Sequence, residues 1–146
     1  MKNEPNTNEA QIRAIIYERI EGVKNKDVNA LIINHAPDVK VFDLLGSLHN
    51  QGVEHVKEGA EKWLSGYKTE IGYEVRDLEI TSGETVAFCK YLYHVSGTLK
   101  TGGEVSMWVR ATICFQKNDG EWKIVHEHQS VPFDVETGKA SLDLKP

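Results

Sequence analysis

Residues 103–133 read "GEVSMWVRATICFQKNDGEWKIVHEHQSVPF", and apolar residues alternate with polar ones on both sides of the turn sequence Asn118-Asp119-Gly120. A period of two is the pattern of β-strands, and Asp-Gly is typical of a hairpin turn. Two more alternating runs precede this stretch, at residues 73–81 and 84–99, and they end in "SG" and "KTGG". We therefore predict four strands, of which the last three form an antiparallel meander.

The first part of the chain has a helical period instead. Within residues 6–27, Asn8 with Gln11 resembles a capping box at the start of a helix. The helical spacing turns Arg19 inward with the apolar stripe and leaves Tyr17 outside it. The stripe comprises Ile12, Ile15, Ile16, Ile20 and Val23.

Three shorter elements complete the predicted order. Residues 26–37 predict a second helix, which Asp27 caps and Pro37 ends. A strand is expected over residues 39–45 and a third helix over residues 53–67. Helices first and a sheet of consecutive strands afterwards indicate an α+β fold, with a curved sheet wrapped over the long helix.

Composition limits the class of protein. The chain has 146 residues and a net charge of −5, which suits a single domain over residues 1–146 with a loosely attached extension at 135–146. No apolar run is long enough to span a membrane, no basic cluster suggests nucleic acid, and the polar N-terminus without a signal-peptide pattern predicts the cytoplasm. Cys89 and Cys114 lie in apolar strands, so we expect buried free thiols.

The order of elements, together with "MWVRATICF" (107–115), "DGEW" (119–122), "HEHQSVPFD" (126–134) and "ETGKA" (136–140), resembles the nuclear-transport-factor-2-like superfamily. This superfamily includes ketosteroid isomerases, SnoaL-type polyketide cyclases and the association domains of calmodulin-dependent kinases. The chain is most similar to SnoaL-like, ketosteroid-isomerase-like proteins. The resemblance implies a cone in which a curved, mostly antiparallel sheet wraps around a long N-terminal helix and two further helices, enclosing an apolar pocket.

The resemblance also implies which strand residues face that pocket. The positions of Ile113 and Gln129 face inward in the kinase association domains, so alternation places Glu127 inside as well. His126 and His128 then share the outer face. They lack a third ligand at suitable spacing, so a hydrogen-bonded patch is favoured over a metal site, and we expect neither a metal nor a cofactor.

Asp43 is the candidate catalytic base, because ketosteroid isomerases have their base at the matching strand end, sixteen residues after a matching Asp27. The alternative is an aspartate bonded to loop amides. The isomerase tyrosine and protonated aspartate correspond to Arg19 and a position near Ile113, so the oxyanion hole is missing and steroid isomerisation is not expected.

The remaining candidate ligand-binding residues are mostly polar. Arg19, Lys90, His94, Glu127 and Gln129 are expected to converge with Asp43, and Trp63 with Tyr67 would supply an apolar wall. In one interpretation Arg19 pairs with Asp43 or Glu127 as a structural network. In the other, the cationic side chains Arg19, Lys90 or His94 hold the carboxylate or enolate oxygen of a small organic ligand.

Two functions from different classes follow. The first is a cofactor-independent proton-transfer enzyme, an isomerase, cyclase or lyase, with Asp43 as base. The second is a non-catalytic ligand-binding or association module, which a pairing of Arg19 with Asp43 would favour because it lowers the aspartate pKa. In either case the outer sheet face, with Trp108, Thr112, Cys114 and Val125, predicts a homodimer, although strict alternation places Val125 on the inward face.

Overall fold

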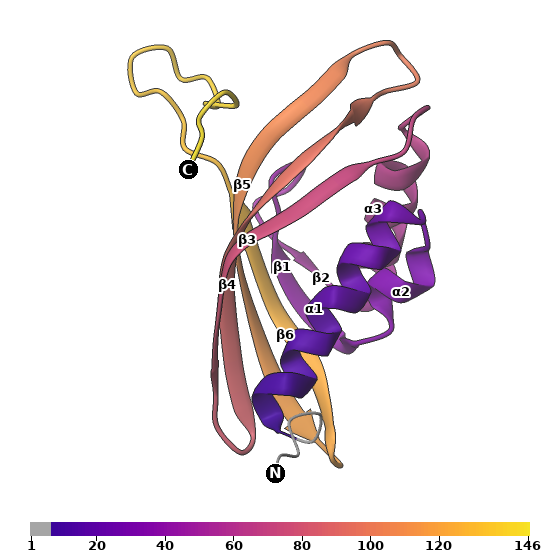
Figure 1. Cartoon of the computed structure of the whole chain (residues 1–146), viewed down its shortest axis with the longest axis vertical. Coiled ribbons are helices and arrows are strands. Elements are labelled where there is room, and N and C mark those ends of the chain that lie inside the picture. Colours follow the sequence, from indigo (N-terminus) through magenta and orange to yellow (C-terminus); the bar gives the residue numbers. More distant parts are fainter. Residues whose placement is uncertain (1–6) are drawn as a thin grey trace.

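Six strands form one curved, open sheet, and three helices gather on its concave side (Figure 1). The computed structural model describes residues 7–146. The strand order is β2-β1-β6-β5-β4-β3, and every neighbouring pair is antiparallel except β1 and β6, which are parallel. This arrangement confirms the predicted α+β cone. The elements are α1 (Asn8–Lys24), α2 (Val28–Ile32), β1 (His35–Phe42), β2 (Asn50–Gln51), α3 (Val53–Ser65), β3 (Gly72–Ser82), β4 (Val86–Thr98), β5 (Glu104–Asn118) and β6 (Glu121–Ser130).

The long helix α1 is oriented as its apolar stripe predicts. Ile12, Ile16 and Val23 are buried, Arg19 turns inward, and Tyr17 stays 55% exposed. Thr7 caps the helix, because its side chain accepts a hydrogen bond from the Ala10 amide, so the predicted Asn8 cap is wrong. None of the helices that the structure describes is long and apolar enough to cross a membrane.

The second helix is shorter than predicted, because the chain enters the sheet earlier. It ends at Ile32, and β1 begins at His35, so the strand expected at 39–45 covers His35–Phe42 instead. Parallel pairing with β6 draws His35 into the sheet opposite Ile124. Pro37 lies where the register of this pair shifts, which suits a residue without a backbone N–H group.

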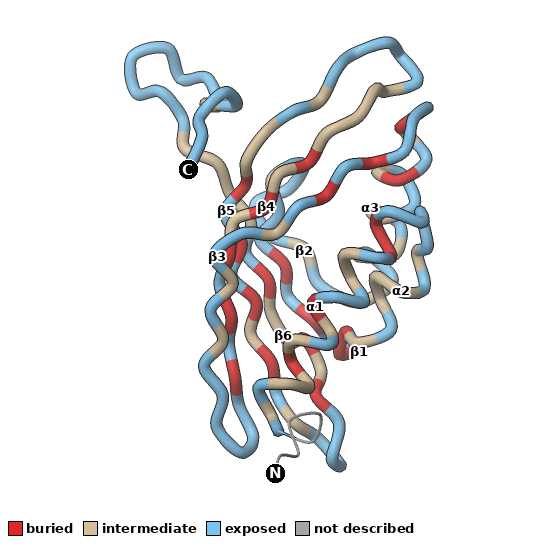
Figure 2. The backbone as a smooth tube through the Cα atoms, in the orientation of Figure 1, coloured by how far each residue is buried: buried red, intermediate tan, exposed pale blue. Residues whose placement is uncertain are grey.

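The predicted orientation of β4 is wrong. Tyr91 pairs with Ala111 and Tyr93 with Val109, and directly opposed residues point to the same face. Since Ala111 and Val109 are buried on the concave face, the two tyrosines are too, and the alternate positions face outward. Figure 2 shows how buried and more exposed stretches succeed one another along the strands of the sheet. The inward residues are Ala87, Cys89, Tyr91, Tyr93 and Val95, and the outward ones include Phe88, Lys90, Leu92 and His94.

A bulge in β6 also changes the predicted orientation of Val125. The register against β5 shifts between Cys114 and Phe115, so Val125 is the extra residue. Strict alternation back from Glu127 would place Val125 inside, but Ile124 is buried and Val125 only half-buried. Beyond the bulge, Glu127 is buried on the concave face, as predicted.

Candidate functional site

A buried carboxylate lies at the centre of the concave face. Glu127 is 2% exposed, and each of its two oxygens contacts a different basic side chain. The Arg19 Nη2 atom donates to Glu127 Oε1, and the His35 Nε2 atom bonds to Glu127 Oε2. Gln129 Nε2 also donates to Glu127 Oε1 at 3.2 Å. The expected pairing of Arg19 with a carboxylate is therefore present, and its partner is Glu127.

The electrostatics of this cluster favour the charged forms of both Glu127 and Arg19. Burial by itself would raise the pKa of Glu127, but the Arg19 charge and the His35 hydrogen bond hold that pKa well below its ordinary value. Burial would likewise lower the pKa of Arg19, yet the Glu127 carboxylate raises it well above the ordinary value. A buried ion pair with these contacts stays ionised at neutral pH.

Three tyrosines adjoin this cluster on the concave face. The rings of Tyr73 and Tyr93 stack with centroids 4.7 Å apart, and Tyr91 lies 6.2 Å from Tyr93. The Tyr93 hydroxyl donates to Gln129 Oε1, which links the tyrosines to Glu127. Burial raises the pKa of Tyr73, and the Arg19 charge and a hydrogen bond with Tyr91 only partly offset that rise. The phenols therefore stay protonated and able to donate hydrogen bonds.

Two polar atoms of the cluster have no partner within residues 7–146. These are Arg19 Nη1 and His35 Nδ1, both inaccessible to solvent. Buried polar groups nearly always find a hydrogen-bond partner, since an unpaired one costs about 1–3 kcal/mol. The Arg19 guanidinium lies close enough to Tyr73 and Tyr91 for both phenols to influence its pKa.

Asp43 follows the last residue of β1 and is exposed, so the prediction that it lies in an enclosed pocket is wrong. Its Oδ1 atom accepts a hydrogen bond from the Leu44 amide at 2.7 Å, and no described cation forms an ion pair with it. The carboxylate is nevertheless close enough to influence the concave face. Burial and the adjacent Tyr73 raise the pKa of Tyr93 well above its ordinary value, and the Asp43 charge adds to that rise.

Lys90 and His94 do not converge with the cluster. Lys90 is exposed on the convex face, 3.6 Å from Glu79, and His94 Nε2 lies 3.1 Å from Ser106 Oγ on the same face. The expected inward orientation of both is wrong for the reason given for β4. Trp63 of α3 does face the tyrosines, with its ring centroid 6.4 Å from those of Tyr67 and Tyr73. Its role as a ligand contact stays a prediction.

The two histidines of "HEHQSVPFD" lie on the outer face, as the resemblance implied. Phe42 contacts both rings edge-on, at 4.7 Å from His126 and 5.6 Å from His128, and His126 Nδ1 bonds to the Lys40 carbonyl at 2.8 Å. Within the described part of the chain, no three His, Cys, Asp or Glu side chains are placed to share a metal ion. The histidines form a patch with Phe42.

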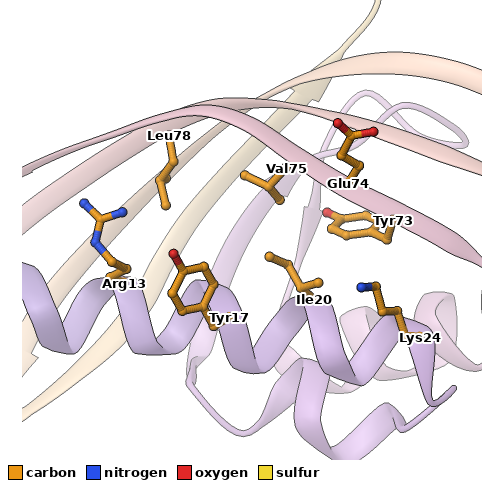
Figure 3. Close-up of a pocket in the computed structure, with 8 residues that line it drawn as sticks. All are labelled: Arg13, Tyr17, Ile20, Lys24, Tyr73, Glu74, Val75 and Leu78. Carbon is orange, nitrogen blue, oxygen red and sulfur yellow. The ribbon is translucent and has the colours of Figure 1, made fainter.

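An open groove of about 350 Å³ runs between α1 and β3 (Figure 3). Arg13, Tyr17, Ile20 and Lys24 line it from the helix, and the strand contributes apolar Val75 and Leu78 with Tyr73 and Glu74. Tyr73 belongs to this wall and also stacks on Tyr93. The groove therefore reaches the edge of the buried polar cluster.

His35, Tyr73, Tyr91 and Tyr93 were not among the predicted site residues. The sequence did contain a pattern that could have identified two of the tyrosines. Tyr91 and Tyr93 are spaced two residues apart in line with Cys89 and Val95, so all four share one face of a predicted strand. No such pattern identified His35, because it lay within the predicted second helix.

Comparison with known proteins agrees with the fold. The family model of the SnoaL-like domain matches residues 12–134, so the chain belongs to that family. A nuclear-transport-factor-2-like protein of unknown function from Pseudomonas putida KT2440 superposes with a TM-score of 0.86 at 26% identity, covering 96% of this chain and 99% of that one. No curated protein sequence matches the chain.

Two more distant solved structures share the fold. A putative dehydratase from Streptomyces avermitilis has a TM-score of 0.74 at 16% identity, covering 86% of this chain and 97% of that one. A putative calcium/calmodulin-dependent protein kinase II association domain from Xanthomonas campestris has the same score and identity, covering 92% and 95%. At this identity the likeness shows the fold alone. The first of these proteins is named as an enzyme and the second as an association domain, so the same fold occurs with both kinds of name.

Proposed function

We propose that the chain binds a small organic molecule on the concave face and transfers a proton on it without a cofactor, as an isomerase, cyclase or lyase. The observation that carries the proposal is the pairing of charges. Glu127 neutralises Arg19, which leaves Asp43 without a cationic partner in the described chain, and the Asp43 charge is close enough to raise the pKa of the buried Tyr93 phenol. A free carboxylate next to a hydrogen-bond donor is the combination that general-base catalysis on a carbonyl compound needs.

Each group has a distinct role in this proposal. Asp43 removes a proton from a carbon next to a carbonyl or carboxylate group of the ligand. The Tyr93 hydroxyl, now bonded to Gln129, or the unused Arg19 Nη1 atom donates to the oxygen on which negative charge develops. Asp43 is exposed, so the ligand itself must displace water from the carboxylate, and the lost hydration makes it a stronger base.

Hydrogen–deuterium exchange tests the proposal without knowledge of the substrate. A panel of small β,γ-unsaturated ketones and 3-keto acids is incubated in D₂O with the protein, and NMR follows exchange at the acidic carbon. Asp43→Asn should reduce the catalysed rate by about 2–4 orders of magnitude. Asp38→Asn, at an exposed carboxylate within β1, is the matched control and should leave the rate unchanged. Catalysed exchange that survives Asp43→Asn would refute Asp43 as the base.

The second candidate is a non-catalytic ligand-binding or association module. The contacts that Arg19 and His35 make with Glu127 favour it, because an ion pair satisfied within the protein can stabilise a binding surface without any chemistry. A ligand that binds wild type and Asp43→Asn with equal affinity, with no exchange on any probe in the panel, would support this alternative.

We also propose a homodimer that packs through the outer sheet face, since the helices cover the other face. Phe42 is 36% and Phe88 44% exposed there, beside half-buried Trp108 and Cys114. Sedimentation at tens of micromolar tests the dimer, and a monomer would refute it. The cytoplasmic location stays a prediction from the sequence.

A further inference from the structure

The C-terminal arm, residues 131–146, has a defined backbone. The Asp134 amide donates to the Lys139 carbonyl and the Gly138 amide to the Asp134 carbonyl, both at 2.7 Å. The Ser141 amide donates to the Pro132 carbonyl at 2.8 Å, and Phe133 forms a bridge with Ala140. These bonds close a turn around Gly138, whose φ of +73° suits glycine.

The arm buries little of its apolar surface. It stands away from the sheet on the side opposite the helices, and almost its whole length is exposed (Figures 1 and 2). The backbone of the arm is held by its own hydrogen bonds, but its apolar side chains remain in water. Such a segment has no surface within its own chain on which to pack. The exposed side chains are Phe133 at 67%, Val135 at 85%, Leu142 at 47% and Leu144 at 52%.

The outer sheet face has complementary chemistry. It carries the exposed rings of Phe42 and Phe88, and its cations Lys40 and Arg110 form no ion pair within residues 7–146. The arm contributes carboxylates that are likewise without an ion pair in that range, at Asp134, Glu136 and Asp143. The arm and the outer face therefore both expose apolar side chains, and the unpaired carboxylates of the arm are opposite in charge to the unpaired cations of the face.

We propose that the arm of each chain packs on the outer face of a second copy of this chain and holds the two together. The inference rests on the homodimer proposed above and adds the element that stabilises it. The arm leaves β6 after Ser130, which pairs with Arg110 in the sheet, so it starts beside this face and points away from its own body. A two-fold axis through the face gives each arm the partner's apolar rings and cations to cover.

Sedimentation equilibrium over a range of concentrations tests the proposal. The variants are a chain ending at Val131 and the full-length Phe133→Ser/Val135→Ser protein. Lys139→Gln/Lys145→Gln replaces two exposed polar residues of the same arm and is the matched control. We expect a wild-type dimer whose Kd rises at least tenfold in both variants and changes less than threefold in the control.

Two results would overturn the proposal in different ways. A wild-type dimer whose Kd is unchanged in the chain ending at Val131 would remove the role of the arm and leave the dimer intact. A monomeric wild type would remove both. Circular dichroism of each variant shows that the sheet is retained, so a higher Kd does not reflect unfolding.

A charge exchange tests the polar part of the contact. Arg110→Glu alone and Asp134→Lys/Glu136→Lys alone should each raise Kd, because each puts like charges together. Combining them should recover part of the loss, since the opposite charges again face one another. Losses that simply add in the combined variant would refute a contact between the arm and Arg110.

Discussion

Replacing Glu127 by glutamine should be among the most destabilising single changes in the chain. The substitution keeps the shape of the side chain, but it removes the negative charge that neutralises Arg19 and replaces one accepting oxygen with an NH2 donor. The side chains of Arg19, Glu127 and His35 are 14%, 3% and 1% exposed, so water cannot replace the lost partner. Removing one member of a buried ion pair costs about 3–5 kcal/mol. With a slope of about 2 kcal/mol per M, the urea midpoint should fall by roughly 2 M.

Urea unfolding followed by circular dichroism measures this loss. Glu121→Gln is the matched control, because Glu121 lies on the same strand but its side chain is 73% exposed, and it should change stability by less than about 0.5 kcal/mol. Arg19→Met combined with Glu127→Leu should recover much of the loss, since an apolar replacement leaves no unpaired charge. If Glu127→Gln loses no more than Glu121→Gln, the buried ion pair does not stabilise the fold as described.

Three further predictions follow from the same contacts. Because the pKa of Glu127 is lower in the folded chain than in the unfolded one, its stabilisation is complete above about pH 4.5 and is lost as pH falls further; the wild-type stability curve should therefore be steeper in acid than that of Glu127→Gln. Burial raises the pKa of Cys89 to about 12, so this thiol should resist a thiol-specific reagent in the native protein at pH 8 and react only after denaturation, and rapid labelling of native Cys89 would contradict its burial. Gly22→Ala would place a Cβ 2.9 Å from the Ala30 Cβ where α1 meets α2 and should cost about 1–3 kcal/mol, whereas Gly59→Ala in α3 meets nothing within 4 Å and should gain about 0.5–1 kcal/mol in urea unfolding.

The sequence predicted best where one periodic pattern was unambiguous. The stripe of α1 admits one orientation, so the inward turn of Arg19 and the outward turn of Tyr17 followed from spacing alone. The order of elements and the meander followed from the switch of period and from turn residues. The inward position of Glu127 needed the resemblance, because a hairpin turn by itself permits either face.

The failures concern long-range pairing, which local patterns do not encode. Both alternating sets of β4 contain apolar residues, so only its register against β5 decides that Tyr91 and Tyr93 face inward and that Lys90 and His94 do not. His35 lies after a helix-like apolar run, and its strand forms only because β6 is available to pair with it. The position of Asp43 at a strand end was predictable, but its exposure depends on the loop that follows.

The location of a bound ligand tests the central proposal most directly. A crystal structure of the protein with any compound that undergoes catalysed exchange should place a ligand oxygen within about 3 Å of the Tyr93 hydroxyl or Arg19 Nη1. The acidic carbon should lie within reach of the Asp43 carboxylate. A ligand bound on the outer sheet face, or on the concave side with its acidic carbon turned away from Asp43, would contradict the proposed proton transfer.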